Sequence, residues 1–291
     1  MPALARKAAA EGIVLLKNNN ALPYKLDTKI SVFGRCQLDY FYVGYGSGGD
    51  VNAPYFVNVI DGIKNAGGHV NEWLLEYYKD FTKNNPAPHG FWGHWPMNFE
   101  EPSLDDKMIE RASEESDVAL VVIGRAAGED RENTLTKGSY YLTDEERNLL
   151  DNVCNHFSNV TVLLDCGNII DMQWVLDYEE RLRGIIYAWQ GGMESGNAIA
   201  DVLFGRVNPS GRLTDTIAVR YEDYPSAMHF GNKLFNTYVE DIFVGYRYFE
   251  TFSKEKALFP FGYGLSYTNF DIEVLDFKRS EERRVGKECR S

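Results

Sequence analysis

Segments that are apolar at nearly every position recur along the chain, and each ends at or near a glycine. They span residues 30–34, 118–124, 160–164 and 184–188, and β-branched residues are frequent in them. Continuous apolar runs of this length are typical of strands that are covered on both faces, as in parallel sheets. The pattern therefore predicts several buried parallel strands.

Helical patterns lie between these runs. Apolar residues recur at helical spacing over residues 3–16, 103–116 and 197–204. A capping box, Thr143-Asp144-Glu145-Glu146, opens a further helix that continues through Cys154. Strands and helices in alternation predict an α/β fold with an open, doubly wound sheet, whose ligands bind at the C-terminal ends of the strands.

Two segments depart from this alternation. Residues 84–102 contain four prolines and several aromatic residues, namely Phe91, Trp92, Trp95 and Phe99. We interpret them as an ordered insertion loop, whose aromatic side chains serve either sugar stacking or packing. Residues 267–274 alternate with period two, as an antiparallel strand does. We therefore expect one α/β domain over residues 1–262 and the start of an all-β domain over 263–278.

The last residues, 279–291, break from the aromatic, acidic sequence before them. They resemble the translation of a sequencing-library adapter, so we interpret them as an artefact and exclude them from the fold. On this interpretation the gene continues beyond Lys278 and its reading frame is truncated.

Composition narrows the possible partners. The 291 residues carry a formal net charge of −13, which argues against binding to nucleic acid. The cysteines and histidines show neither metal-ligand spacing nor a nucleophile–histidine pair, and Cys166 reads as a buried thiol. The chain begins without an apolar signal region, and no stretch is long enough to cross a bilayer. We expect a cytoplasmic protein with no membrane partner and no metal.

The loop of residues 124–133 is the strongest candidate for chemistry. It follows a predicted strand and combines small residues with three acidic residues and two arginines. Such a loop lies at the ligand edge of a doubly wound sheet. Within it Asp130 would raise the proton affinity of Glu129, whereas Arg131 would lower it. On the residues alone, a solvated loop with local Arg–Asp pairing is the favoured explanation of the segment.

Two glycine-rich segments follow other predicted strands. Residues 44–49 formally satisfy the dinucleotide pattern G-x-G-x-x-G. A true dinucleotide site turns directly from strand into helix, whereas here residues 50–54 intervene, which favours a tightly turned loop at the sheet edge. Residues 189–196, which begin Trp-Gln-Gly-Gly, could shape the same edge or simply form a turn.

Several of these segments, taken in order, resemble the α/β sandwich domain of glycoside hydrolase family 3. The resemblance covers residues 3 to about 270. Its most specific stretch is Glu-Asp-Ile-Phe-Val-Gly-Tyr-Arg-Tyr-Phe at residues 240–249, followed by Phe-Pro-Phe-Gly-Tyr-Gly-Leu-Ser-Tyr-Thr at 259–268. The other matching segments are residues 8–18, 22–23, 121–124, 128–131, 188–192, 209–216 and 221–226.

The resemblance implies a mostly parallel, six-stranded sheet between helices, a separate (α/β)8 barrel, and a fibronectin-III-like domain that begins where the all-β pattern begins. The family's barrel supplies an aspartate nucleophile in a Ser-Asp-Trp motif, and its sandwich supplies a glutamate acid/base. That glutamate maps onto Glu129, with Asp130 and Arg131 as substrate-binding residues. Many relatives read Gly-Glu-Gly-x-Asp-Arg where this chain reads Gly-Glu-Asp-Arg, so Asp130 and Glu132 stay open as alternatives.

The implied activity is that of a retaining β-glucosidase, which removes terminal β-D-glucose from a small glucoside or oligosaccharide without a cofactor. The Ser-Asp-Trp motif is absent from this chain. We therefore expect the missing barrel of the same protein as partner, in a permuted member with the sandwich first, or else a fragment of the common domain order. The alternatives are a stand-alone carbohydrate- or nucleotide-binding module and a structural domain in which Glu129 has no role.

Overall fold

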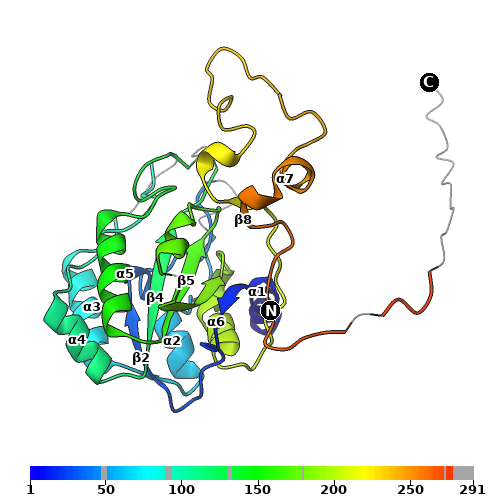
Figure 1. The fold of residues 1–291 in the computed structure, drawn as a ribbon. Coiled ribbons are helices and arrows are strands. Elements are labelled where there is room, and N and C mark those ends of the chain that lie inside the picture. Colours follow the sequence, from blue (N-terminus) through cyan, green and yellow to red (C-terminus); the bar gives the residue numbers. More distant parts are fainter. Residues whose placement is uncertain (47–50, 89–93, 130–132, 179, 272, 278–291) are drawn as a thin grey trace.

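A six-stranded sheet forms the centre of the computed structural model, which describes residues 1–46, 51–88, 94–129, 133–178, 180–271 and 273–277 (Figure 1). The strands are β1 (Val14–Asn18), β2 (Lys29–Phe33), β3 (His69–Val70), β4 (Val118–Arg125), β5 (Val160–Cys166) and β6 (Leu182–Tyr187). Their order in the sheet is β1-β6-β5-β4-β2-β3. All neighbours pair in parallel except β1 with β6. The predicted doubly wound, mostly parallel sheet is confirmed.

Strand β1 corrects one expectation. The helical pattern over residues 3–16 predicted a single helix, but helix α1 (Pro2–Gly12) ends at Gly12 and the chain continues as β1. Val14, Leu15 and Leu16 are all buried. A helix that packs on a sheet buries only one side of its own surface, whereas a strand that is covered on both faces buries consecutive residues. Three consecutive buried residues therefore favour the strand.

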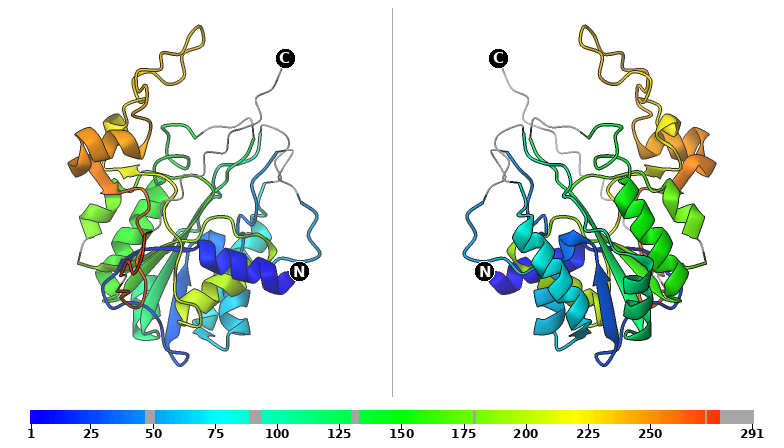
Figure 2. Two further views of the ribbon diagram at one scale, coloured as in Figure 1. Left: turned by 90° about the vertical axis from the view of Figure 1, so that its right-hand side faces the viewer. Right: turned by 90° about the vertical axis from the view of Figure 1, so that its left-hand side faces the viewer.

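Helices cover both faces of the sheet (Figure 2). Helices α3 (Glu72–Asn84), α4 (Asp106–Glu114) and α5 (Asp144–His156) contribute to one core, and α1, α2 (Val59–Asn65) and α6 (Ser195–Leu203) to the other. Strand residues alternate between the two cores: Val121 and Ile123 point to the first, Leu120 and Val122 to the second. This alternation explains why the strands are apolar at every position.

Polar side chains fix where the helices begin. The side chains of Asn58, Asn71 and Asp105 accept backbone N–H groups in the first turns of α2, α3 and α4. Thr143 and Glu146 form the predicted capping box at the start of α5. These caps satisfy donors that would otherwise lack partners, so they end the preceding loops at defined residues.

After the sheet, the chain adds a small two-stranded sheet of β7 (Ile217–Ala218) and β8 (Ala257–Phe259), with helix α7 (Tyr246–Phe252). Short 3-10 turns occur at Arg35–Gln37, Gln173–Tyr178, Gly192–Glu194, Tyr221–Asp223 and Lys254–Lys256. Between β7 and β8, residues 228–245 extend away from the body as a loop, which we call the arm (Figures 1 and 2).

The antiparallel strand expected over residues 267–274 is not found where the structure describes that segment. Residues 263–271 and 273–277 form no helix or strand in the structure, apart from an isolated bridge between Leu265 and Leu15. The domain boundary at 263 is therefore not tested, and the segment 279–291 lies outside the described residues. Among the helices that the structure describes, none is long and apolar enough to cross a membrane.

Candidate active site

The sheet has one topological switch point, between β2 and β4. From β2 the chain goes to β3 on one side, whereas β4, β5 and β6 follow one another on the other side. The loops that leave β2 and β4 at their C-terminal ends therefore depart in different directions, which is where open α/β sheets bind ligands. The candidate loop of residues 124–133 follows β4 at this point.

A glycine turns the chain sharply at the end of β2. Gly34 has a φ of 91°, and a Cβ atom there would overlap the carbonyl oxygen of Val122 on β4. Only glycine fits this close approach without strain. The turn sends the following residues across the C-terminal end of β4, toward the candidate loop.

The loops after β2 and β4 then pair through their backbones. The Tyr45 N–H donates to the Ala127 carbonyl oxygen at 2.8 Å, and the Glu129 N–H donates to the Tyr45 carbonyl oxygen at 3.1 Å. The pairing forms an isolated parallel bridge between Tyr45 and Gly128. Residues 44–46 of the predicted glycine-rich loop thus lie beside Glu129, and residues 47–49 lie outside the described residues. The next helix begins only at Val59, which fits the prediction of a turned loop rather than a dinucleotide site.

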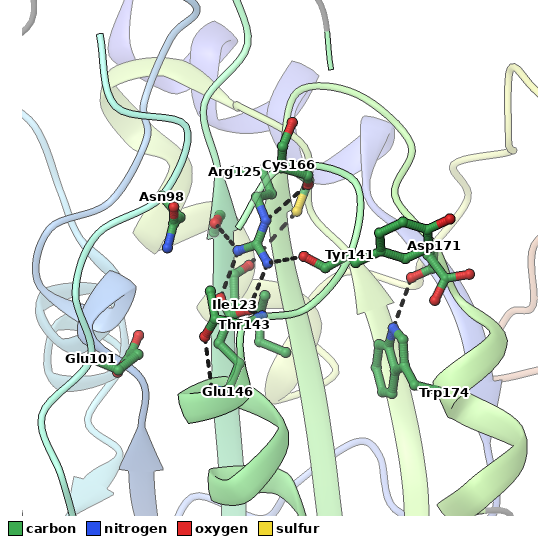
Figure 3. Close-up of polar contacts among 12 residues, drawn as sticks. Asn98, Glu101, Ile123, Arg125, Tyr141, Thr143, Glu146, Cys166, Asp171 and Trp174 are labelled. Atoms are coloured by element: carbon green, nitrogen blue, oxygen red, sulfur yellow. Dashed lines mark hydrogen bonds and ion pairs between the residues drawn. The ribbon is translucent and has the colours of Figure 1, made fainter. Parts of the chain in front are cut away.

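A buried ion pair secures the base of the candidate loop (Figure 3). Arg125, the last residue of β4, donates from Nη1 and Nη2 to the two carboxylate oxygens of Glu146, each at 2.6 Å. Both side chains are almost fully buried. Burial disfavours the charged guanidinium, but the Glu146 carboxylate more than offsets it and raises the pKa of Arg125.

The same guanidinium also holds the segment that leads from the candidate loop to α5. Its remaining donors reach the carbonyl oxygens of Ser139 and Tyr141 at 3.1 and 3.2 Å, and that of Gly124 at 2.7 Å. Glu146 is in addition the third residue of α5 and accepts the Thr143 N–H at 2.8 Å. One buried cluster therefore joins the end of β4, the end of the loop and the start of α5.

Glu129 itself is exposed at the tip of the supported segment. The other predicted site residues, Asp130 and Arg131, and the alternative Glu132 lie outside the described residues. The assignment of Glu129 as acid/base, and of Asp130 and Arg131 as substrate-binding residues, therefore stays a prediction.

Other polar residues line the same edge of the sheet. Gln190, which follows β6, donates to the Arg125 carbonyl oxygen at 3.4 Å, in keeping with the expectation that residues 189–196 could shape this edge. Asn168, which follows β5, donates to Asn133 in the candidate loop at 3.4 Å. Asn168 was missed, although its place just after a predicted strand was a usable signal.

The insertion loop packs inward where the structure describes it. Trp95 is 1% exposed and stacks on Tyr45 with a centroid separation of 5.2 Å, and Phe99 stacks on Phe41 at 4.6 Å. Packing, rather than sugar stacking, therefore explains Trp95 and Phe99. Phe91 and Trp92 lie outside the described residues.

Two acidic side chains, one half-buried and one fully buried, lie beside the site. The Glu101 carboxylate accepts the Arg35 N–H at 2.9 Å; burial, then the nearby charge of Glu146, raises its pKa to about 8. Asp165 on β5 is fully buried and accepts the Phe41 N–H at 2.6 Å, which anchors the segment that leads to Tyr45. Burial raises the pKa of Asp165 well above its usual value.

An apolar cleft of about 870 Å³ opens beyond the candidate loop. Its lining residues come from the end of that loop, from the segment after β5 and from the base of the arm: Asn133, Thr134, Leu135, Tyr140, Asn168, Ile169, Tyr221, Tyr224, Ser226, Ala227 and Phe230. Among the described residues, no group of His, Cys, Asp and Glu is arranged to hold a metal ion. Cys166 is buried, as predicted, and its Sγ lies 3.9 Å from the Ile123 carbonyl oxygen.

The fold and its switch point define a doubly wound α/β domain with a carboxylate-bearing loop at the ligand edge. Residues 13–267 match the model of the glycosyl hydrolase family 3 C-terminal domain, and the chain belongs to this family.

Several of the relatives that the chain matches are β-glucosidases. The chain is 48% identical over 271 residues to a β-glucosidase of Ruminococcus albus, covering 93% of this chain and 28% of that protein. It is 37% identical to β-glucosidase A of Butyrivibrio fibrisolvens, covering 98% of this chain and 37% of the relative. A solved β-glucosidase from Paenibacillus barengoltzii superimposes with a TM-score of 0.90 at 50% identity, over 92% of this chain and 29% of that structure. The chain thus spans roughly a third of the length of its relatives.

We expect Glu146→Ala to reduce the free energy of unfolding by about 3–5 kcal/mol, because it leaves the Arg125 charge buried and unpaired. Urea unfolding measures the loss. The matched control is Asp144→Asn on the same helix, whose ion pair with Lys137 is largely exposed, and which should lose less than about 1 kcal/mol. Equal losses in the two variants would contradict a structural role for the buried pair.

Glu101→Gln should change how stability depends on pH. The pKa of Glu101 is about 8 in the folded chain against an ordinary value of 4.5, so unfolding between these values releases a proton and stability falls as pH rises. The amide cannot ionise but keeps the acceptor for the Arg35 N–H. Relative to wild type, the variant should gain about 1–4 kcal/mol between pH 5 and pH 8, measured by urea unfolding at both values. Glu100→Gln, at the exposed neighbouring position, is the control and should show no such gain.

Proposed function

We propose that this chain is the acid/base-bearing part of a retaining β-glucosidase, and that Glu129 is the general acid/base. The observation that carries the proposal is the position of Glu129 at the switch point, on a loop whose base and flank are both held by hydrogen bonds. Membership of a family in which several matched relatives are β-glucosidases supports the reaction class. The substrate is a small β-glucoside or oligosaccharide, and the reaction needs no cofactor.

Retaining hydrolysis needs two carboxyl groups on opposite sides of the glycosidic bond, about 5–5.5 Å apart. Glu129 donates its proton to the leaving oxygen while a nucleophile forms the glycosyl-enzyme. It then removes a proton from the water that attacks this intermediate. The apolar cleft beyond the loop, with Tyr140 and Tyr221 in its wall, offers a surface on which an apolar leaving group can rest.

A further domain must provide the nucleophile, because the Ser-Asp-Trp motif that the family resemblance implies is absent here. The arm supports the existence of such a domain. Met228, Leu234 and Tyr238 on it are 86–91% exposed. Exposed apolar side chains in such a concentration mark a surface that another domain covers. We assign this covering role to the (α/β)8 barrel of the complete protein.

The isolated 291-residue chain should not hydrolyse an aryl β-glucoside, since one of the two required carboxyl groups is missing. Release of the aryl group by purified chain is the measurement. Turnover that Glu129→Gln abolishes would show that the chain holds a complete site.

In the complete enzyme, Glu129→Ala should impair substrates with poor leaving groups most, since an activated aryl leaving group needs little protonation. The glycosyl-enzyme should accumulate, because no base activates water. Added azide needs no deprotonation and should restore turnover, giving a β-glucosyl azide, which mass spectrometry and NMR identify.

The control is Glu145→Ala, an exposed glutamate on α5, which should behave as wild type in the same assays. Equal losses on activated and unactivated substrates, without azide rescue, would reject Glu129, and the test would pass to Asp130 and Glu132.

A further inference from the structure

The residues around Glu129 form a support that the proposed mechanism does not itself require. Tyr45 contacts the segment 127–129 through both its N–H and its carbonyl group. Its ring lies on Trp95 with an interplanar angle of 18°, and Trp95 is buried beneath. The pairing thus rests on a rigid aromatic base rather than on solvent.

Two glycines allow this support to approach the acid/base loop. A Cβ atom on Gly128 would lie 2.5 Å from Cζ2 of Trp95 and 2.8 Å from the Tyr45 carbonyl oxygen. A Cβ atom on Gly46, whose φ is 101°, would lie 2.6 Å from Cβ of Glu129. Contacts this short do not occur between real Cβ atoms and their neighbours, so a side chain at either position must displace the loop.

The support is itself anchored in the core on its far side. The buried Asp165 fixes the Phe41 N–H, and the Tyr42 carbonyl oxygen accepts the Gly192 N–H at 2.8 Å. From Phe41 to Gly46 the chain is therefore tied to β5, to the turn after β6 and to the loop after β4. A displacement at Glu129 requires one of these ties to give way.

We infer that Tyr45 and Gly46, backed by Trp95, are positioning residues that fix the backbone of Glu129 against the glycosidic oxygen. This inference rests on the proposed role of Glu129. Their function is geometric: proton donation falls steeply when donor and acceptor are misplaced by an ångström. None of the three residues takes part in the proton transfer.

The test compares Gly46→Ala with Gly67→Ala. Gly67 also has a positive φ, of 80°, but a Cβ atom there meets nothing within 4 Å, so both variants strain the backbone and only the first presses on Glu129. In the complete enzyme, Gly46→Ala should lower kcat for a glucoside with a poor leaving group by about 10- to 100-fold, with a smaller loss on an activated aryl glucoside and little change in KM. Gly67→Ala should keep the wild-type rates.

A second pair of variants addresses Trp95. Trp95→Phe keeps a flat ring under Tyr45, whereas Trp95→Ala removes it, so only the alanine variant should show the leaving-group-dependent loss. In the 291-residue chain, hydrogen exchange at the Glu129 amide, which donates to Tyr45, should accelerate in Gly46→Ala and Trp95→Ala only. Unchanged hydrogen exchange in both variants would overturn the inference that Tyr45, Gly46 and Trp95 position Glu129. Kinetic losses that are equal on the two substrates would overturn it too.

These readouts separate the two proposals. In the first case, Glu129→Ala lacks azide rescue while the amide of Glu129 still loses protection in Gly46→Ala. The structural contact then stands, but the catalytic role of Glu129 fails and the positioning role fails with it. If azide rescue is found but Gly46→Ala matches Gly67→Ala in all measurements, the acid/base assignment stands and the positioning role is overturned.

Discussion

The buried pair of Arg125 and Glu146 is the interaction on which the candidate site depends. A guanidinium and a carboxylate out of water are costly unless every donor finds an acceptor, and here the pair is bidentate while the remaining donors of Arg125 reach backbone carbonyl groups. The pair acts less as a source of stability than as a constraint, since any movement of β4 against α5 would break several charge-assisted bonds together. The polar segment between β4 and α5 therefore leaves the core at Arg125 and returns to it at Ser139 and Tyr141.

The topology of the sheet places a second constraint on the same loop. Because β2 and β4 are neighbours at the switch point, the segments that follow them run side by side, and Tyr45 pairs with the residues before Glu129. The loop is thus held at its base by side chains and along its flank by backbone bonds. These backbone hydrogen bonds do not depend on residue type. The close approach of the two segments does, because it requires glycine at Gly46 and Gly128 and the ring of Trp95 beneath Tyr45.

Local patterns explain what the sequence predicts well. Neighbouring residues alone specify the capping box of Thr143 and Glu146 and the apolar runs of β2, β4, β5 and β6. The structure contains all of these elements. Strand β1 was mistaken for helix because Val14–Leu16 is too short a run for its period to decide. The pairing of Arg125 with Glu146, and of Tyr45 with Gly128, joins residues far apart in the chain, so no local pattern specifies it. The assignment of Glu129 rests on the family resemblance, because the residues of its loop alone favour a solvated turn.

The division between what this chain fixes and what it leaves open follows from these contacts. The backbone of Glu129 is held, but its side chain is exposed, whereas a carboxylic acid that protonates a leaving group near neutral pH works best when it is withdrawn from water. On the proposed function, the withdrawal must come from the domain that covers the loop and the apolar arm. The sandwich then contributes the geometry of proton transfer and the covering domain its environment, so neither half alone has a functional acid. On the proposed function, such a division ties catalysis to the closed interface between the two domains.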